Sequence, residues 1–153
     1  MAERILYLDL DGVLADFDRG VEIITGKRPD QQSTRAMWSA LSRHADFFGT
    51  LEMMRDAKEL WEYCAPHKPV ILTGLPLGNW AAAQKQRWVA NMLGEDVEVI
   101  TCMSRDKPKW SRPGHVLVDD REKTKGGWEA NGGTFILHTS AATSIRALKE
   151  LGL

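Results

Sequence analysis

Two hydrophobic patterns alternate along the chain. Short apolar runs predict buried β-strands, and longer segments with apolar residues three or four positions apart predict helices. The predicted strands are 5–8, 70–74, 97–101, 115–118 and 134–137, and the predicted helices are 15–25, 34–43, 54–63, 79–93, 122–131 and 140–151. Strands that alternate with helices favour right-handed crossovers and a parallel sheet. The pattern therefore predicts a single α/β domain with a central parallel sheet between two helical layers.

One segment, from Lys27 to Thr50, interrupts this alternation. It is rich in Pro, Gln, Ser and Thr and is too long for a simple connection in an α/β unit, yet too short to fold alone. We therefore predict a small helical cap at residues 17–50, inserted after the first strand into a core made of residues 1–16 and 51–153. The aromatic residues of the cap, Trp38, Phe47 and Phe48, could either pack beneath it or line a pocket.

Two carboxylates follow the first strand. Asp9 and Asp11 come at the carboxyl end of an apolar run, where α/β sheets bind ligands, and Gly12 permits a positive φ angle. Carboxylates this close repel each other unless a proton or a cation offsets their charge, and Mg²⁺ prefers oxygen ligands. A calcium loop is excluded because Val13 and Leu14 stand where polar ligands are required. An ordinary polar turn is the alternative that these residues alone leave open.

Other polar residues occupy the ends of later strands. Thr73 and Gly74 end the second strand, Asp119 and Asp120 follow the fourth, and a basic segment at 104–114 carries two candidate lysines, Lys107 and Lys109. Together with Asp9 and Asp11 they supply a nucleophile, an acid/base, a hydroxyl donor, a cation and metal-binding acids. This combination predicts a reaction centre at the carboxyl edge of the sheet.

Composition narrows the function classes. A chain of 153 residues with a net charge of −1 has the size of one domain and lacks the basic surface that binds nucleic acid polymers. It has no secretory signal and no apolar run long enough to cross a bilayer, so we expect a cytoplasmic protein without a membrane partner. Cys64 and Cys102 are expected to be reduced, buried thiols. No feature of the sequence predicts an oligomeric state.

The ordered set of strand-end residues resembles the haloacid dehalogenase superfamily. That superfamily has four motifs, an Asp-x-Asp-Gly, a strand-terminal Thr or Ser, a Lys, and a pair of acids, and the match extends over essentially the whole chain. Local matches to its 5′(3′)-deoxyribonucleotidase branch are residues 9–17, Asp46-Phe47-Phe48 with Leu51-Glu52, Lys85 with Trp88, Arg105-Asp106-Lys107 and residues 117–121. The resemblance implies a Rossmann-like fold with sheet order 5-4-1-2-3, in which the first strand is central.

The resemblance also implies a Mg²⁺-dependent phosphomonoester hydrolase that acts on a small molecule, with nucleoside monophosphates the first substrates to test. Asp9 would attack the phosphorus, Asp11 would act as the acid/base, and Lys107 is preferred over Lys109 because of its local match. The implied site residues are Asp9, Asp11, Asp119 and Asp120 for Mg²⁺, Thr73, Gly74 and Lys107 for the phosphoryl group, and Phe17, Trp38, Phe48, Lys85 and Arg121 for the substrate.

Three alternatives accompany this prediction. The substrate could be another small phosphorylated metabolite, because the chain lacks an aromatic cluster that the branch has earlier in its cap. A dehalogenase would need neither a metal nor an acid at Asp11. A non-catalytic module that must hold its phosphoryl group would gain nothing from an acid/base at Asp11, which hydrolyses that group.

Overall fold

The computed structural model of the protein, which describes residues 3–153, contains one five-stranded sheet in which all neighbouring strands are parallel. Its strands are β1 (Ile5–Leu8), β2 (Val70–Gly74), β3 (Val99–Cys102), β4 (His115–Asp119) and β5 (Thr134–Leu137). They lie in the order β3-β2-β1-β4-β5, with β1 in the centre. The predicted fold class and sheet order are both confirmed.

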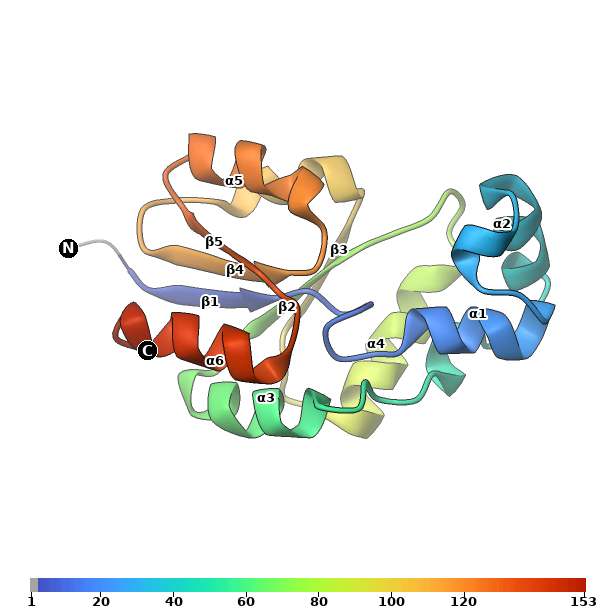
Figure 1. The fold of residues 1–153 in the computed structure, drawn as a ribbon, viewed down its shortest axis with the longest axis horizontal. Coiled ribbons are helices and arrows are strands. Elements are labelled where there is room, and N and C mark those ends of the chain that lie inside the picture. Colours follow the sequence, from blue (N-terminus) through green and yellow to red (C-terminus); the bar gives the residue numbers. More distant parts are fainter. Residues whose placement is uncertain (1–2) are drawn as a thin grey trace.

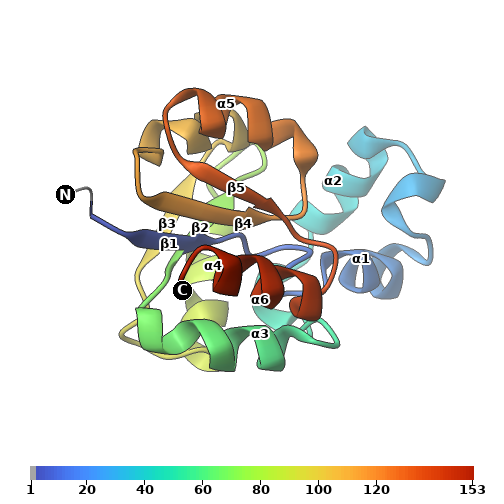
Figure 2. The same ribbon diagram turned by 60° about the vertical axis from the view of Figure 1, so that its left-hand side comes forward.

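Helices cover both faces of the sheet (Figures 1 and 2). One face carries α3 (Ala57–Cys64), α4 (Ala81–Met92) and α6 (Ala141–Glu150), and the other carries α5 (Lys125–Ala130). Successive residues of a strand point to opposite faces. Leu6 and Leu8 of β1 therefore belong to the large core under α3, α4 and α6, whereas Tyr7 packs against the buried ring of Trp128 on α5. This alternation produces the three layers.

After β1, residues 17–50 leave the sheet and form a separate lobe beyond the carboxyl ends of the strands, at the right of Figure 1. This segment, called the insertion below, contains α1 (Phe17–Thr25), η1 (Pro29–Gln31), α2 (Thr34–Ser42) and η2 (Phe48–Thr50). Helix α1 begins later than the sequence pattern predicts because the Asp16 side chain accepts a hydrogen bond from Arg19 N and caps the helix.

The return segment of the insertion is attached to α4. Phe48 N donates to Gln84 Oε1 at 2.9 Å, and Trp88 Nε1 donates to the Leu51 carbonyl at 2.7 Å. Both contacts are buried, so the end of the insertion is held by the core. Trp88 and Trp128 are fully buried in the core, whereas Trp61 on α3 is only half-buried.

Two segments differ from the predicted pattern, because 104–114 is partly helical and the helix predicted over 122–131 is divided in two. Residues 104–114 begin with a 3₁₀ helix, η4 (Ser104–Trp110), and residues 122–131 form the short η5 (Glu122–Thr124) followed by α5. A Cβ atom at Gly127 would lie 2.8 Å from Pro108 Cγ, so the glycine lets α5 approach η4 closely. The glycines that weaken α5 as an isolated helix therefore serve its packing.

The two cysteines differ in burial. Cys64 is fully buried, as predicted, and burial raises the pKa of its thiol to about 12, while Cys102 at the end of β3 is only partly buried. Neither forms a disulfide within residues 3–153. In the same part of the chain, every helix is too short or too polar to cross a lipid bilayer.

Candidate active site

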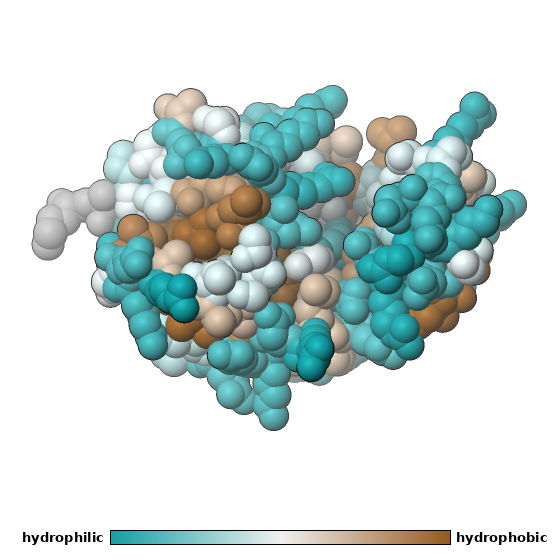
Figure 3. All heavy atoms as spheres, viewed as in Figure 1, coloured by the Kyte–Doolittle hydropathy of each residue, from teal (hydrophilic) through white to brown (hydrophobic). Residues whose placement is uncertain are grey.

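A cleft of about 1100 Å³ lies between the carboxyl edge of the sheet and the insertion. Its position corresponds to the hollow between the two lobes in Figure 3. Most of the residues that the sequence predicts for the site line this cleft: Asp9, Asp11, Gly74, Lys85, Lys107, Asp120 and Arg121 from the core, and Phe17 and Trp38 from the insertion. The predicted reaction centre and the predicted substrate residues therefore share one cavity.

Asp9 follows β1 directly and is paired with a buried lysine. Lys107 Nζ lies 2.9 Å from Asp9 Oδ1 and 2.9 Å from Asp119 Oδ2. Burial raises the pKa of Asp9, but the charge and hydrogen bond of Lys107, together with hydrogen bonds from Asp120 and Asp119, outweigh burial and hold the pKa below its ordinary value. Lys109 lies at the surface, 3.3 Å from Asp106. Of the two candidate lysines, Lys107 is therefore the one that contacts the proposed nucleophile.

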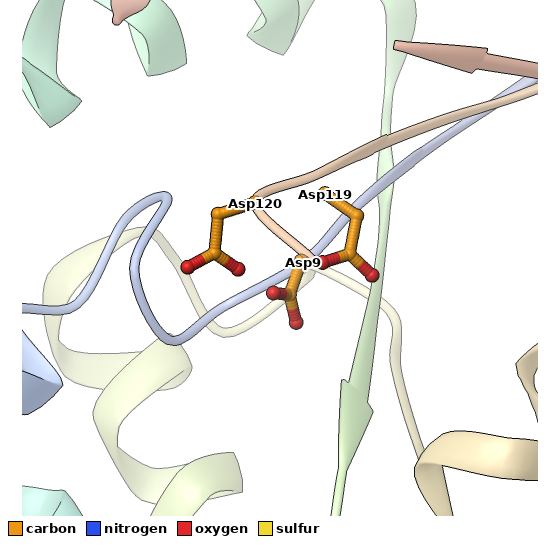
Figure 4. A group of neighbouring side chains, drawn as sticks. All are labelled: Asp9, Asp119 and Asp120. Atoms are coloured by element: carbon orange, nitrogen blue, oxygen red, sulfur yellow. The ribbon is translucent and has the colours of Figure 1, made fainter. Parts of the chain in front are cut away.

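Three carboxylates gather at the ends of β1 and β4. One oxygen atom from each of Asp9, Asp119 and Asp120 lies within 4.8 Å of the others (Figure 4). Both oxygens of Asp119 accept hydrogen bonds, one from Lys107 Nζ and one from Arg121 N at 2.9 Å. Asp119 is thus fixed by the protein, whereas Asp120 is exposed at the cleft.

The cluster carries more negative charge than Lys107 compensates. Burial, followed by the charge of Asp9, raises the pKa of Asp119 to about 6, and burial with the charges of Asp9 and Asp119 raises the pKa of Asp120 to about 8. Hard oxygen donors with uncompensated charge fit a divalent cation such as Mg²⁺. Gly12 contributes to this fit in two ways. Its φ of 82° is one that glycine adopts readily, and a Cβ at this position would overlap the Asp120 carboxylate.

This charge excess predicts how pH affects the stability of the metal-free protein. A carboxyl whose pKa is raised by folding binds its proton more tightly in the folded state, so its stabilising contribution is lost as pH rises. For Asp120 the window extends from 3.8 to about 8, and the exposure of this side chain makes the effect moderate. We expect the melting temperature in EDTA to fall between about pH 5 and about pH 8.

A divalent cation held by these carboxylates would bind their deprotonated forms, so Mg²⁺ should raise the melting temperature most at the upper end of this range. The Asp120→Asn variant should lose most of the Mg²⁺ response. A wild-type protein whose melting temperature is independent of Mg²⁺ at both ends of the range would contradict the metal assignment.

Asp11 lies on the opposite side of Leu10 from Asp9 and contacts a different lysine. Lys85 Nζ donates to Asp11 Oδ2 at 2.8 Å, to Thr73 Oγ1 at 2.9 Å and to the Gly74 carbonyl at 2.6 Å. Burial raises the pKa of Asp11, and Lys85 only partly opposes this effect. The two neighbouring acids thus have opposite pKa shifts, which is the pattern of an ionised nucleophile beside a protonated acid.

The apolar wall of the cleft is aromatic. The ring centroids of Phe17 and Trp38 lie 5.6 Å apart, and those of Trp38 and Trp80 lie 6.3 Å apart. Phe48 lies behind this wall with 1% of its surface exposed, and the Lys85 ammonium lies 4.5 Å from its ring centroid. The sequence left open whether these aromatic residues line a pocket or pack beneath the cap. In the structure Trp38 lines the cleft, whereas Phe47 and Phe48 pack beneath the insertion.

Several residues that line the cleft are absent from the predicted site, among them Trp80 and Arg35. Trp80 falls within the helix predicted over 79–93 but lies just before α4, and Arg35 is exposed on α2. The position of Trp80, in a connection from strand to helix at the carboxyl edge of the sheet, is a signal that could have identified it. Arg35 has no such signal, because its place depends on how the insertion folds over the core.

Comparisons with known proteins point in one direction. No protein-family model matches the chain. A protein of Vibrio phage KVP40, provisionally named 5′(3′)-deoxyribonucleotidase, is 29% identical over 125 residues, which cover 80% of this chain and 69% of that protein.

Several solved structures are also similar. A haloacid dehalogenase superfamily hydrolase from Ehrlichia chaffeensis has a TM-score of 0.59 at 9% identity, covering 99% of this chain and 100% of that one. L-2-haloacid dehalogenase from Xanthobacter autotrophicus has a TM-score of 0.51 at 16% identity, covering 96% and 88%. A haloacid dehalogenase family hydrolase from Deinococcus radiodurans, solved with bound phosphate and sodium, has a TM-score of 0.51 at 16% identity, covering 92% of this chain and 86% of that one.

Proposed function

We propose that this chain, which has the fold of the haloacid dehalogenase superfamily, is a Mg²⁺-dependent phosphomonoester hydrolase that acts through an aspartyl-phosphate on Asp9. The observation that carries the proposal is that Asp9 and Asp11, two acids separated by one residue, have pKa shifts in opposite directions. Lys107 favours the anionic form of Asp9, and burial favours the protonated form of Asp11. A nucleophile and a general acid are needed in these two states at the start of phosphoryl transfer.

The reaction has two displacements at phosphorus. In the first, an Asp9 oxygen forms a bond to phosphorus while the bond to the leaving oxygen breaks, and Asp11 gives its proton to that oxygen. In the second, Asp11, now a carboxylate, takes a proton from a water molecule whose oxygen bonds to phosphorus. The bond from phosphorus to Asp9 then breaks, which releases phosphate and restores both side chains.

The surrounding charges hold the phosphoryl group. Lys107 lies beside Asp9 in the cleft and can contact a phosphoryl oxygen on that side, and the Gly74 backbone is also at the cleft surface. Thr73 is buried with its hydroxyl against Lys85, so its place is at the base of the site. Mg²⁺, held by Asp9, Asp120 and the Asp11 carbonyl with Asp119 as support, would supply the positive charge that lets a carboxylate approach a dianionic phosphate.

The aromatic wall supports a substrate with a planar ring, and we propose a nucleoside monophosphate such as a 5′(3′)-deoxyribonucleotide. The provisional name of the phage relative agrees with this substrate class. The test is phosphate release from nucleoside 5′- and 3′-monophosphates, ribose 5-phosphate and p-nitrophenyl phosphate, with Mg²⁺ or with EDTA. We expect Mg²⁺-dependent release with nucleotides preferred. Metal-independent release, or release of chloride from 2-chloropropionate in its place, would contradict the proposal.

Replacing Trp38 with Ala should separate binding from chemistry. Stacking on a nucleobase is worth about 1–3 kcal/mol, so KM for a preferred nucleotide should rise about tenfold while kcat changes little. KM for ribose 5-phosphate, which has no base, should stay unchanged. Trp61→Ala, which removes a half-buried tryptophan from α3, is the matched control for the loss of an indole. Equal effects on both substrates would show that Trp38 does not contact a base.

A further inference from the structure

We infer that Lys85 is a positioning residue for Asp11, which fixes the orientation of the carboxyl group that exchanges the proton, and that it does not bind substrate. This inference rests on the proposed function. It departs from the expectation, taken from the sequence, that Lys85 contacts the substrate. The evidence is that the Lys85 ammonium has a protein acceptor for each of its three hydrogen-bond donors.

A lysine ammonium has three hydrogen-bond donors. The Lys85 ammonium has three protein acceptors, Asp11 Oδ2, Thr73 Oγ1 and the Gly74 carbonyl, at 2.8, 2.9 and 2.6 Å. The side chain is 1% exposed although its tip reaches the cleft wall. A substrate oxygen could bind Lys85 only by displacing one of these acceptors, so the geometry favours a structural task over direct recognition.

The two oxygens of Asp11 are held differently. Oδ2 accepts the charge-assisted hydrogen bond from Lys85, whereas Oδ1 is the one buried side-chain oxygen or nitrogen in residues 3–153 with no hydrogen-bond partner. With Oδ2 bound to Lys85 and Oδ1 buried, the rotation of the carboxyl group is fixed, and with it the direction in which Asp11 exchanges a proton with the cleft. A carboxyl group that turned freely would lose this orientation, and small misplacements of a reacting group cost about 10²-fold in rate.

The elements that meet at Lys85 explain how the position is fixed. The lysine comes from α4, Asp11 from the loop after β1, and Thr73 and Gly74 from the end of β2. Lys107 comes from η4 and contacts Asp9 and Asp119. Each lysine therefore serves one of the two reacting acids, and within residues 3–153 the two lysines share no hydrogen-bond acceptor.

The Lys85→Met variant tests the inference with two phosphate esters. For an alkyl phosphate, whose leaving oxygen needs a proton, kcat/KM should fall about 10²-fold, mainly through kcat. For p-nitrophenyl phosphate, whose leaving oxygen needs almost no proton, kcat/KM should fall much less. Lys58→Met, at an exposed position on α3, is the matched control and should behave as wild type with both esters.

A double-mutant cycle shows whether Lys85 acts through Asp11. In the Asp11→Asn background the Lys85→Met substitution should reduce kcat/KM by less than about twofold, because the group it positions is already absent. This pair removes both charges together, so it leaves no uncompensated buried charge. The Lys85→Arg variant keeps the charge and provides the comparison with wild type if Lys85→Met does not fold. It should again affect the alkyl ester more than p-nitrophenyl phosphate, because a planar guanidinium cannot reproduce the three contacts.

The opposite results identify a substrate-binding lysine. A rise in KM at constant kcat, equal losses for both esters, or a full additional loss in the Asp11→Asn background would overturn the inference. The proposed function fails in a different way, namely if wild type releases phosphate from neither ester, and the inference then falls with it.

Discussion

The Asp9→Asn variant should release phosphate at least about 10⁴-fold more slowly than wild type, because an amide oxygen cannot replace the carboxylate as nucleophile. Asparagine has nearly the same shape, so the packing around β1 should be preserved. Lys107 keeps Asp119 as a buried partner at 2.9 Å, which leaves its charge compensated. The loss should therefore appear in kcat without a comparable change in thermal stability.

The measurement is phosphate release at saturating Mg²⁺ together with the melting temperature of each variant. Asp30→Asn, which changes an exposed acid of η1, is the matched control and should retain full activity. Activity of Asp9→Asn within about tenfold of wild type would show that another group attacks the phosphorus.

The Lys107→Met variant should combine the largest loss of stability with loss of activity. Lys107 is 2% exposed, and its ammonium is shared by Asp9 and Asp119. Methionine would leave two buried acids without their counter-cation, and breaking such a buried pair costs about 3–5 kcal/mol. The cost should be greatest at neutral pH and should shrink as the pH is lowered, because protonation removes the charges that need compensation.

Urea unfolding of Lys107→Met at two pH values, with and without Mg²⁺, measures this cost. Lys109→Met is the control, and since Lys109 is exposed we expect a change within about 0.5 kcal/mol. Mg²⁺ should restore part of the stability of Lys107→Met, because a second cation can compensate the same acids. Equal effects of the two substitutions would contradict the buried role of Lys107.

The fold follows from the sequence because its strands are marked by unusually clear signals. The run from Ile5 to Leu8 is apolar at every position, as required of a strand covered on both faces, and the central place of β1 was implied by the family resemblance. Helix ends were less accurate. Asp16 and Ser140 lie outside α1 and α6 as caps, a distinction that depends on backbone angles more than on hydrophobic pattern.

The candidate site was predictable where residues sit at strand ends. Asp9, Thr73 and Asp119 converge because neighbouring parallel strands end at the same edge, so strand order alone brings them together. The roles of Lys85 and Trp80 were not predictable in this way. Each depends on where a helix or loop passes over the edge of the sheet and on which acceptors it meets there, and periodicity carries no information about such contacts.

In the insertion, too, the sequence does not predict which aromatic residue lines the cleft. Trp38 and Phe48 are both aromatic residues of one segment, yet one lines the cleft and the other is 1% exposed behind it. Gln84 on α4 accepts a hydrogen bond from Phe48 N, which holds the backbone of that residue against the core. Such a contact joins residues 36 positions apart, so hydrophobic periodicity does not predict it.

The most direct measurement of the proposed chemistry is the detection of a phosphoryl group on Asp9. In the Asp11→Asn variant, p-nitrophenyl phosphate should phosphorylate Asp9 because its leaving group needs little protonation, while hydrolysis of the intermediate is slowed by the missing base. Acid quenching followed by peptide mass spectrometry should then find one phosphoryl group on the peptide that contains Asp9, accompanied by a burst of nitrophenolate. Turnover by wild type with no such burst and no phosphorylated Asp9 in Asp11→Asn, or with the phosphoryl group on another residue, would contradict a mechanism through Asp9.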